Sequence, residues 1–250
     1  MSVPREAGSG KREALSREVG GERREALTAP VEDYLKAIYA IGKGSGAAAT
    51  NEIAQRLALT PASVSGMVRR LADQGLLAYE RYRGVKLTES GRRAALRTLR
   101  RHRVIEAYLA EALGYPWDRV HDEAERLEHA ASDELVDRMA ATIGEPEVDP
   151  HGAPIPTRDG SVDETVYRSL ADLEVGSTGV VVRVSDEDPE MLRYLAELTI
   201  VPGKRLTVKA HAPFDGPITL SVGRQELSIG PALAAQVMVA PIADRGVKRG

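Results

Sequence analysis

The chain has 250 residues, of which 42% are hydrophobic and 4% aromatic, and its formal net charge at pH 7 is -3. That apolar fraction can bury an aliphatic core, which excludes a wholly disordered chain. The sequence contains no cysteine. This excludes disulfide scaffolds, thiol catalysis and thiolate metal sites, and it fits a reducing, cytoplasmic setting.

The N-terminal residues 1–28 mix charged residues with glycine and lack the apolar stretch of a signal peptide. We therefore expect a flexible tail there. The longest uncharged run spans residues 227–243 and is broken by Gly230, Pro231 and Pro241. A membrane-spanning helix needs about 20 consecutive apolar residues, so we expect no membrane association.

The pattern over residues 29–95 predicts a winged helix-turn-helix. Apolar residues at near-helical spacing predict a first helix over 31–42. Thr50 and Thr60 are suitable N-caps for two short helices, the second of which has Pro61 at its first position. Segments 76–80 and 84–88 then predict a short hairpin, the wing.

Residues 51–105 carry 12 Lys and Arg against 4 acidic residues, a local charge of +8, so the rest of the chain totals -11. By itself, this charge fits a solvated helix face as well as a DNA-binding surface. Together with the predicted helix-turn-helix and wing, it favours DNA binding. We expect the helix after Thr60 to contact base edges in the major groove, and nearby arginines to contact phosphates or the minor groove. The expected DNA-binding residues are Thr60, Ala62, Ser63, Ser65, Gly66, Arg69, Arg70, Arg81 and Arg83.

Three further helices are predicted over the next part of the chain: one from Ser90 to about Leu113, one opening at Pro116, and one over 133–143. They define a domain over 96–144, and their apolar positions exceed what a small helical domain needs internally, so we expect them to form a homodimer. Four prolines in residues 145–163 predict an extended linker.

Residues 164–243 contain five short β-rich runs bounded by Gly, Pro and Asp, with a helical stretch at 188–198 between the first two runs. This pattern predicts a small β-barrel. The fold class predicted for the whole chain is therefore mostly α with a β C-terminal domain.

Histidines and glutamates four residues apart fall on two of the central helices. His102 pairs with Glu106, and His121 pairs with Glu125. Residues four apart share a helix face, so the second helix presents a stripe that comprises His121, Glu125, Glu128 and His129. Convergent imidazole and carboxylate donors favour divalent Mn, Fe, Co, Ni or Zn over Ca or Mg. The alternative interpretation is ordinary salt-bridging on exposed helices.

Enzyme signatures are absent from the sequence. It contains no HExxH motif, and Arg126 stands where a di-iron Glu-x-x-His half-site ending at His129 would need glutamate. A metal-dependent hydrolase with an incidental helix-turn-helix remains one alternative, and a winged-helix protein with purely structural metal sites remains another. His151 and His211 stand alone in the sequence, so we expect no ligand role for them.

Five segments follow one another along the chain in the order found in a known protein family: EDYLKAIY, YRGVKLTESG, RRHRVIEAYL, VHDEAERLEHAASDEL and DPHGAPIP. Together with the predicted helix-turn-helix they resemble the diphtheria toxin repressor family of metal-activated repressors. The resemblance extends over about residues 30–240 and is strongest to the three-domain form of the manganese-responsive branch, the manganese transport regulators. It implies that the C-terminal barrel is an SH3-like (FeoA-like) domain.

The resemblance also implies two metal sites. The first comprises Asp33, Glu125, Glu128 and His129. The second, ancillary site comprises His102, Glu106 and His121, joined by acceptors from the barrel, for which Glu187 and Glu190 have the matching spacing and Asp186 lies nearby.

Iron-responsive members of the family have a methionine and a cysteine where this chain has Asp33 and Glu125. Hard oxygen donors suit Mn²⁺, so the resemblance implies Mn²⁺ as the cofactor, with Fe²⁺, Co²⁺ or Zn²⁺ as substitutes. One departure is Lys36, which stands where the short manganese regulators have a further glutamate, so their two-metal arrangement is not assumed.

The implied function is that of a manganese-activated repressor that binds palindromic operators in double-stranded DNA as a homodimer and controls metal-uptake genes. One or two dimers on each operator are both compatible with this function. An iron-activated or other metal-activated repressor of the same family is the alternative.

Overall fold

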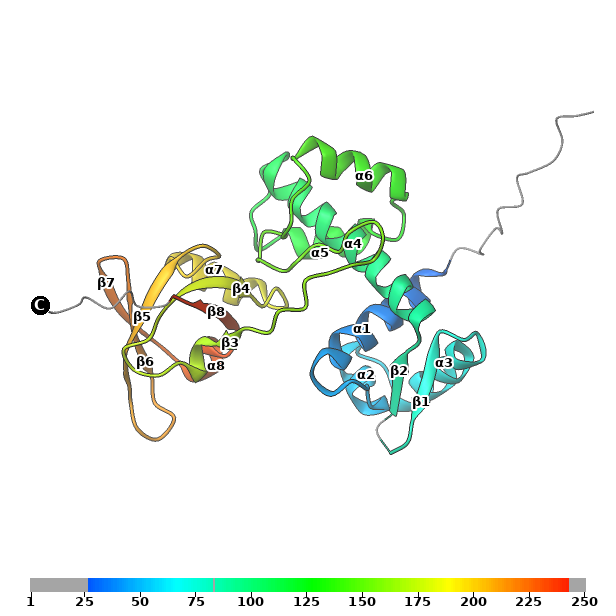
Figure 1. Cartoon of the computed structure of the whole chain (residues 1–250), viewed down its shortest axis with the longest axis horizontal. Coiled ribbons are helices and arrows are strands. Elements are labelled where there is room, and N and C mark those ends of the chain that lie inside the picture. The colour runs from blue at the N-terminus through cyan, green and yellow to red at the C-terminus, as the bar shows by residue number, and fades with distance from the viewer. Residues whose placement is uncertain (1–26, 83, 243–250) are drawn as a thin grey trace, which may run out of the picture.

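The computed structural model describes residues 27–82 and 84–242. Most of the predicted N-terminal tail and Arg83 therefore lie outside the described residues. Figure 1 shows three parts in chain order: helices with a two-stranded wing, a second group of helices, and a sheet with short helices. Among the described residues, no helix is long and apolar enough to cross a membrane.

The first part is a winged helix-turn-helix, as predicted. Its elements are α1 (Ala29–Ser45), α2 (Thr50–Arg56), α3 (Pro61–Asp73), β1 (Leu77–Glu80) and β2 (Gly84–Leu87). The predicted cap is present, since the Thr60 hydroxyl accepts a hydrogen bond from the Ser63 amide at 3.3 Å. α1 is longer than predicted because it continues through Gly42 and ends only at Gly46, whose backbone is left-handed at φ 76°.

The long helix α4 (Glu89–Glu111) contributes to three hydrophobic clusters, one in each of the packings described next. Ala95, Leu96 and Leu99 in its first half pack into the core of the winged helix-turn-helix. In its second half, Val104 packs against Val136 of α6 (Asp133–Thr142). Ile105 and Leu109 pack against Val120 of α5 (Val120–Leu127). α4 is therefore the continuous connection between the two helical parts (Figure 1).

The prediction of a helix that begins at Pro116 is wrong at both ends of the helix. Residues 116–119 form a turn, and α5 is only eight residues long, with Glu128 as its C-cap and His129 in the turn that follows. The short helix leaves Glu128 and His129 at its C-terminal end, where they approach α1.

The proline-rich segment after α6 is folded against α4. Ile155 is buried beside Val104 and Val136. The Asp149 side chain accepts hydrogen bonds from the amides of His151 and Ala153, each at 2.9 Å. These contacts fix the backbone of residues 149–153 close to the second half of α4.

The C-terminal part is a six-stranded antiparallel sheet in the order β3-β8-β4-β5-β6-β7. Its elements are β3 (Arg168–Ser169), β4 (Thr178–Val184), α7 (Pro189–Glu197), β5 (Arg205–His211), β6 (Ile218–Val222), β7 (Gln225–Ile229), α8 (Pro231–Ala234) and β8 (Val237–Pro241). The five predicted strands are all present, and the mostly α fold with a β C-terminal domain is confirmed. The short elements β3 and α8, which have two and four residues, were not predicted from the sequence.

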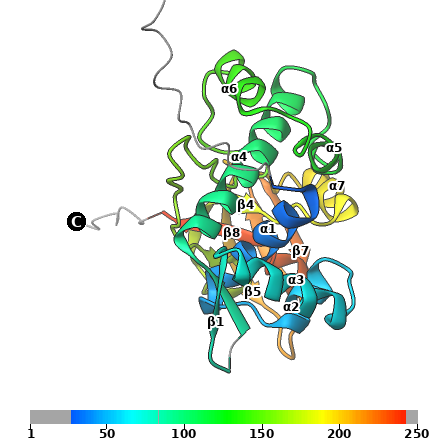
Figure 2. The same ribbon diagram turned by 90° about the vertical axis from the view of Figure 1, so that its right-hand side faces the viewer.

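The sheet domain contacts the helical domain at the start of α5. A guanidinium nitrogen of Arg193 on α7 lies 2.9 Å from a carboxylate oxygen of Asp118. Figure 2 shows α7 beside α5, with the sheet behind α1 and α4. This contact places the loop between β4 and α7 next to the histidines of α4 and α5.

Candidate metal centre

Nitrogen and oxygen donors converge at two adjacent places along the second half of α4. We call the first the bridging site and define it as Asp33, Glu128 and His129, which lie together, and Glu125, which the family resemblance adds and which the structure groups with Glu128 and His102. We call the second the ancillary site and define it as His102, Glu106 and His121.

The bridging site joins the DNA-binding helices to the following helices. Asp33 comes from α1, whereas Glu128 and His129 come from the end of α5. The donor atoms of these three residues lie within 4.8 Å of one another, and the His129 Nε2 lies 2.9 Å from the Asp33 Oδ1. That oxygen is buried, and its contact with His129 is an ion pair that lacks hydrogen-bond geometry, so it accepts no hydrogen bond from the described residues. Burial raises the pKa of Asp33, and the positive charge of His129, the largest opposing effect, offsets only part of this rise. A cation would satisfy this orphaned oxygen.

Glu32 orients the His129 ring, a role that the sequence analysis missed. The His129 Nδ1 lies 2.8 Å from one oxygen of Glu32, and the other Glu32 oxygen accepts a hydrogen bond from Arg101 at 2.9 Å. Burial lowers the His129 pKa, but the bond to Glu32 and the charges of Asp33 and Glu128 outweigh it and raise the pKa. With Nδ1 bonded to Glu32, Nε2 is left to face the bridging site, as in carboxylate-oriented metal ligands.

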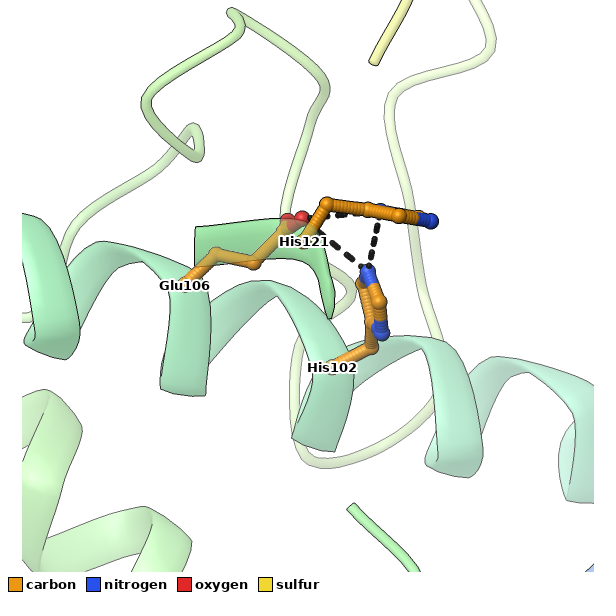
Figure 3. A group of neighbouring side chains, drawn as sticks. All are labelled: His102, Glu106 and His121. Atoms are coloured by element: carbon orange, nitrogen blue, oxygen red, sulfur yellow. Dashed lines mark hydrogen bonds and ion pairs between the residues drawn. The ribbon is translucent and has the colours of Figure 1, made fainter. Parts of the chain in front are cut away.

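The ancillary site brings together His102 and Glu106 from α4 and His121 from α5 (Figure 3). The His102 Nε2 lies 3.0 Å from the Glu106 Oε1 and 3.2 Å from the His121 Nδ1. The His121 Nδ1 lies 3.2 Å from the Glu106 Oε1. His102 and Glu106 are buried, and the Glu106 Oε2 has no hydrogen-bond partner among the described residues. Three donors at these distances suit a small divalent ion.

The pKa values in the ancillary site are strongly shifted. Burial lowers the pKa of His102, but the Glu106 charge and hydrogen bonds to Glu106 and Glu128 outweigh it and raise the pKa to about 10. Burial raises the pKa of Glu106, but the charge and hydrogen bond of His102 hold it far below its usual range. Without metal, a proton on His102 therefore supplies the positive charge between two carboxylates.

Two residues outside the predicted set face the ancillary site. The Asp186 Oδ2 lies 3.8 Å from the His121 Nδ1, and the His151 Nδ1 lies 3.9 Å from the Glu106 Oε1. His151 is fully buried, its Nε2 donates to the Trp117 carbonyl at 2.8 Å, and its Nδ1 has no hydrogen-bond partner among the described residues. The isolated position of His151 in the sequence gave no sign of this placement, which depends on the turn held by Asp149.

The structure does not bring Glu187 or Glu190 to the ancillary site. The Glu187 carboxylate lies 2.9 Å from a guanidinium nitrogen of Arg56 on α2. Glu190 is exposed in the first turn of α7, where the Asp188 side chain caps the helix. The chain turns outward after Asp186, so the residue before the predicted pair is the one that faces His121.

The two sites are linked through Glu128 and His102. One Glu128 oxygen lies 2.6 Å from the His102 Nδ1, while the other lies 2.7 Å from the Lys36 Nζ. The His102 ring therefore directs one nitrogen toward each site. Glu125 lies between them, with its Oε1 3.6 Å from the His102 Nδ1 and 3.9 Å from the His121 Nε2.

The residues expected to contact DNA lie on the outer face of the winged helix-turn-helix. Val64, Val68 and Leu71 of α3 are buried. The exposed residues of α3 and its cap include all of the expected ones: Thr60, Ala62, Ser63, Ser65, Gly66, Arg69 and Arg70. Arg81 is exposed at the wing, where its guanidinium donates to the Tyr82 hydroxyl at 2.8 Å. Arg83 lies outside the described residues, as noted above.

Comparison with known proteins assigns the three parts of the chain. Residues 26–85 match the family model of the iron dependent repressor N-terminal DNA binding domain, and residues 88–157 match its metal binding and dimerisation domain. Residues 168–241 match the FeoA domain.

Individual relatives agree with these matches. The iron-dependent repressor IdeR of Mycobacterium tuberculosis is 32% identical over 226 residues, which are 85% of this chain and 97% of the relative. The regulator MntR of Lysinibacillus sphaericus is 34% identical over 116 residues, which are 46% of this chain and 83% of the relative. A solved manganese-dependent transcriptional repressor in complex with manganese matches with a TM-score of 0.80 and 42% identity, covering 85% of this chain and 100% of the other. The chain therefore belongs to the diphtheria toxin repressor family of metal-dependent transcriptional repressors, in the three-domain form that ends in a FeoA domain.

Proposed function

We propose that this protein is a cytoplasmic, manganese-activated repressor that binds palindromic operators as a homodimer and controls metal-uptake genes. The bridging site carries the proposal, because it joins Asp33 of the DNA-binding helices to Glu128 and His129 of the dimerisation helices. Its donors are three carboxylates and one imidazole, a hard set that suits Mn²⁺. A similar solved repressor is described as manganese-dependent.

The residues of the bridging site can control the position of the DNA-binding helices. Asp33 lies on the same helix as Leu35 and Ile38, which are buried in the same core as Leu71 of α3. Asp33, Glu128 and His129 would hold a divalent ion, whose positive charge would keep Asp33 close to the other two residues. Fixing α1 in this way fixes α3, because the two helices share one core.

The DNA interface follows from symmetry. In a dimer, the two copies of α3 must enter successive major grooves, which are about 34–36 Å apart. A small change in the angle between the two helical parts alters this spacing, so metal binding favours the DNA-competent arrangement. The exposed small polar residues of α3 permit close approach to base edges, and the surrounding arginines supply phosphate contacts.

We propose that the dimer forms through the helices between Ser90 and Ile143. Leu113, Leu127 and Leu135 are more than one third exposed in the single chain, which supports a partner surface there. Sedimentation should give a dimer at micromolar concentration with saturating Mn²⁺, with or without DNA. A monomer under these conditions would contradict the proposal.

The domain boundaries form part of the same proposal. The DNA-binding domain spans 29–95, the metal-binding and dimerisation domain spans 96–144, and the C-terminal domain spans 164–243, joined by the linker 145–163. The ancillary site, with Asp186 added from the sheet domain, connects the last two domains. Asp186 and His151 take the places in this site that the sequence analysis gave to Glu187 and Glu190.

The direct test is DNA binding as a function of metal. Fluorescence anisotropy with a duplex from the gene's own upstream region should show binding with Mn²⁺ and none with chelator. Equal binding with and without chelator would indicate purely structural metal sites, and no binding under either condition would favour an enzyme. Titrations with Fe²⁺, Co²⁺ and Zn²⁺ then rank the metals by activation.

Three variants connect this assay to the bridging site. The double variant Asp33→Met, Glu125→Cys should shift activation from Mn²⁺ toward Fe²⁺ or Co²⁺, because sulfur donors soften the site. His129→Ala should abolish activation by every metal, and His102→Ala should only weaken it. An unchanged Mn²⁺ response in the double variant would refute the assignment of the bridging site.

A further inference from the structure

A cavity lies where the DNA-binding helices meet the sheet domain. Its volume is about 610 Å³, within the range of sites that hold small molecules. Its walls come from α1 and β2, from residues 163–167 just before β3, and from Arg183 on β4 and Met238 on β8. The described residues that line it include no member of the bridging or ancillary site. A molecule bound here would therefore contact segments that are far apart in the sequence, without involving either metal site.

Basic side chains outnumber acidic ones around this cavity. The basic residues are Lys43, Lys86, Arg92 and Arg183, and the acidic ones are Asp163 and Glu164. A hollow lined by an excess of one sign of charge attracts ligands of the opposite sign. The lining therefore favours an anion.

Two of the four basic residues already have carboxylate partners. Arg92 donates a hydrogen bond to the Glu164 Oε1 at 2.9 Å, and the same oxygen accepts one from the Tyr39 hydroxyl at 3.0 Å. The Lys86 Nζ lies 2.8 Å from the Glu80 Oε2. These two pairs are neutral, so they leave Lys43 and Arg183 as the source of the positive charge.

Lys43 and Arg183 have no carboxylate partner. The Lys43 Nζ lies over the Tyr39 ring, 5.0 Å from its centroid, and Arg183 is half-buried on β4. Among residues 27–82 and 84–242, neither side chain takes part in a hydrogen bond or an ion pair. The remaining carboxylate, that of Asp163, accepts hydrogen bonds from the amide and hydroxyl of Thr165 at 2.9 and 2.6 Å. Two cations thus face the cavity unpaired.

The pKa of Lys43 reflects the same excess of positive charge. Burial, followed by the charges of Arg103 and Arg183, lowers this pKa to about 8, and the charge of Glu164 opposes the shift only in part. At about pH 7 most of the Lys43 amine is still protonated. A bound anion would favour the protonated form and raise the pKa.

We propose that this cavity binds a small organic phosphate between Lys43 and Arg183. A phosphate monoester carries about 1.5 to 2 negative charges at neutral pH, which matches the two unpaired cations. The guanidinium of Arg183 can bind two phosphate oxygens at once. Ile38, Leu87 and Met238 provide an apolar wall for the organic part. The inference goes beyond the proposed function, because this site needs no metal.

Calorimetry on the metal-free, full-length chain tests the inference. The probes are adenosine monophosphate, glucose 6-phosphate and glycerol 3-phosphate, and at least one of them should bind with one molecule per chain. Inorganic phosphate should bind at least about tenfold more weakly than that probe, because it does not fill the apolar part of the cavity. No binding of any probe, or equally tight binding of inorganic phosphate, would overturn the inference.

Matched variants locate the site. Lys43→Met and Arg183→Gln should each weaken binding of the phosphate probe at least about tenfold, because each removes one of the two cations. Lys209→Met and Arg224→Gln make the same charge changes at exposed positions outside the cavity and should leave the affinity unchanged. An equal loss in both pairs of variants would show attraction to the net charge alone and would refute the site.

A second readout does not depend on the heat of binding. The phosphate probe should raise the melting temperature of the metal-free chain, because a ligand that binds only the folded state stabilises it. This rise should disappear in Arg183→Gln and persist in Arg224→Gln. A rise of the same size in Arg183→Gln would place the phosphate elsewhere on the protein and would overturn the inference.

Discussion

Metal binding at the ancillary site should be strongly linked to pH through His102. In the metal-free protein its Nδ1 lies 2.6 Å from Glu128 and its Nε2 lies 3.0 Å from Glu106. Despite the opposing effect of burial, these carboxylates raise the His102 pKa to about 10. The Nε2 must lose its proton before it can bind an ion, because metal ligands are deprotonated.

The size of the effect follows from that pKa. At about pH 7 the His102 pKa lies about 3 units above the pH, and each unit corresponds to about 1.4 kcal/mol. Removing the proton therefore costs about 4 kcal/mol at this pH, which lowers the apparent affinity for metal about a thousandfold. The apparent affinity should rise about tenfold for each pH unit between about pH 7 and 9.

Calorimetry measures both quantities. Mn²⁺ is titrated in two buffers that differ in ionisation enthalpy, at several pH values, with His129→Ala present to disable the bridging site. The difference between the buffers gives the number of protons released, which should be about one per ion. An affinity that does not change with pH, with no proton release, would refute the argument that His102 is protonated in the metal-free protein.

Four further predictions concern other parts of the molecule. The metal-free protein should lose thermal stability as the pH rises, because the His102 pKa is about 10 in the folded state and lower in the unfolded state. The stabilisation by protonated His102 is complete below about pH 6.5 and is lost above about pH 10. Glu32→Gln should weaken Mn²⁺ binding in the bridging site about tenfold by calorimetry, because His129 loses its carboxylate partner; an unchanged affinity would remove Glu32 from the site. Gly91→Ala should lower the melting temperature by several degrees, since its Cβ would lie 2.0 Å from a backbone oxygen; an unchanged melting temperature would show that the backbone can yield there. Arg81→Ala should weaken binding to all DNA sequences alike and reduce the salt dependence by about one phosphate contact; an effect confined to one sequence would mean that Arg81 contacts a base instead.

The sequence predicted the helix-turn-helix well because its signals are local. Thr60 and Pro61 mark the start of α3 in any context, and the cap at Thr60 is present in the structure. The i,i+4 spacing likewise placed His102 and Glu106 on one helix face, where they lie 3.0 Å apart. Caps and helical periodicity depend only on neighbouring residues, so one sequence is enough to recognise them.

The contacts of Asp186, which the sequence suggested only as a neighbour of the expected acceptors, and of His151, for which no ligand role was expected, join distant segments. Asp186 reaches His121 across 65 positions, and His151 reaches Glu106 because a turn held by Asp149 folds onto α4. Periodicity carries no information about such approaches. Glu32 was overlooked for another reason, since a charged residue in the first turn of a helix is ordinarily explained by the helix dipole.

The ion pair between Glu187 and Arg56 has a consequence for DNA affinity. It ties the loop before α7 to α2, and Arg56 belongs to the basic segment 51–105. When Glu187 neutralises Arg56, that guanidinium is not available to a phosphate, so the sheet domain lowers the positive potential of the DNA-binding part while it is docked. Undocking would return one positive charge to that surface. Because both side chains are exposed and segment 51–105 carries a charge of +8, docking lowers that charge by one and its effect on nonspecific attraction to DNA is small.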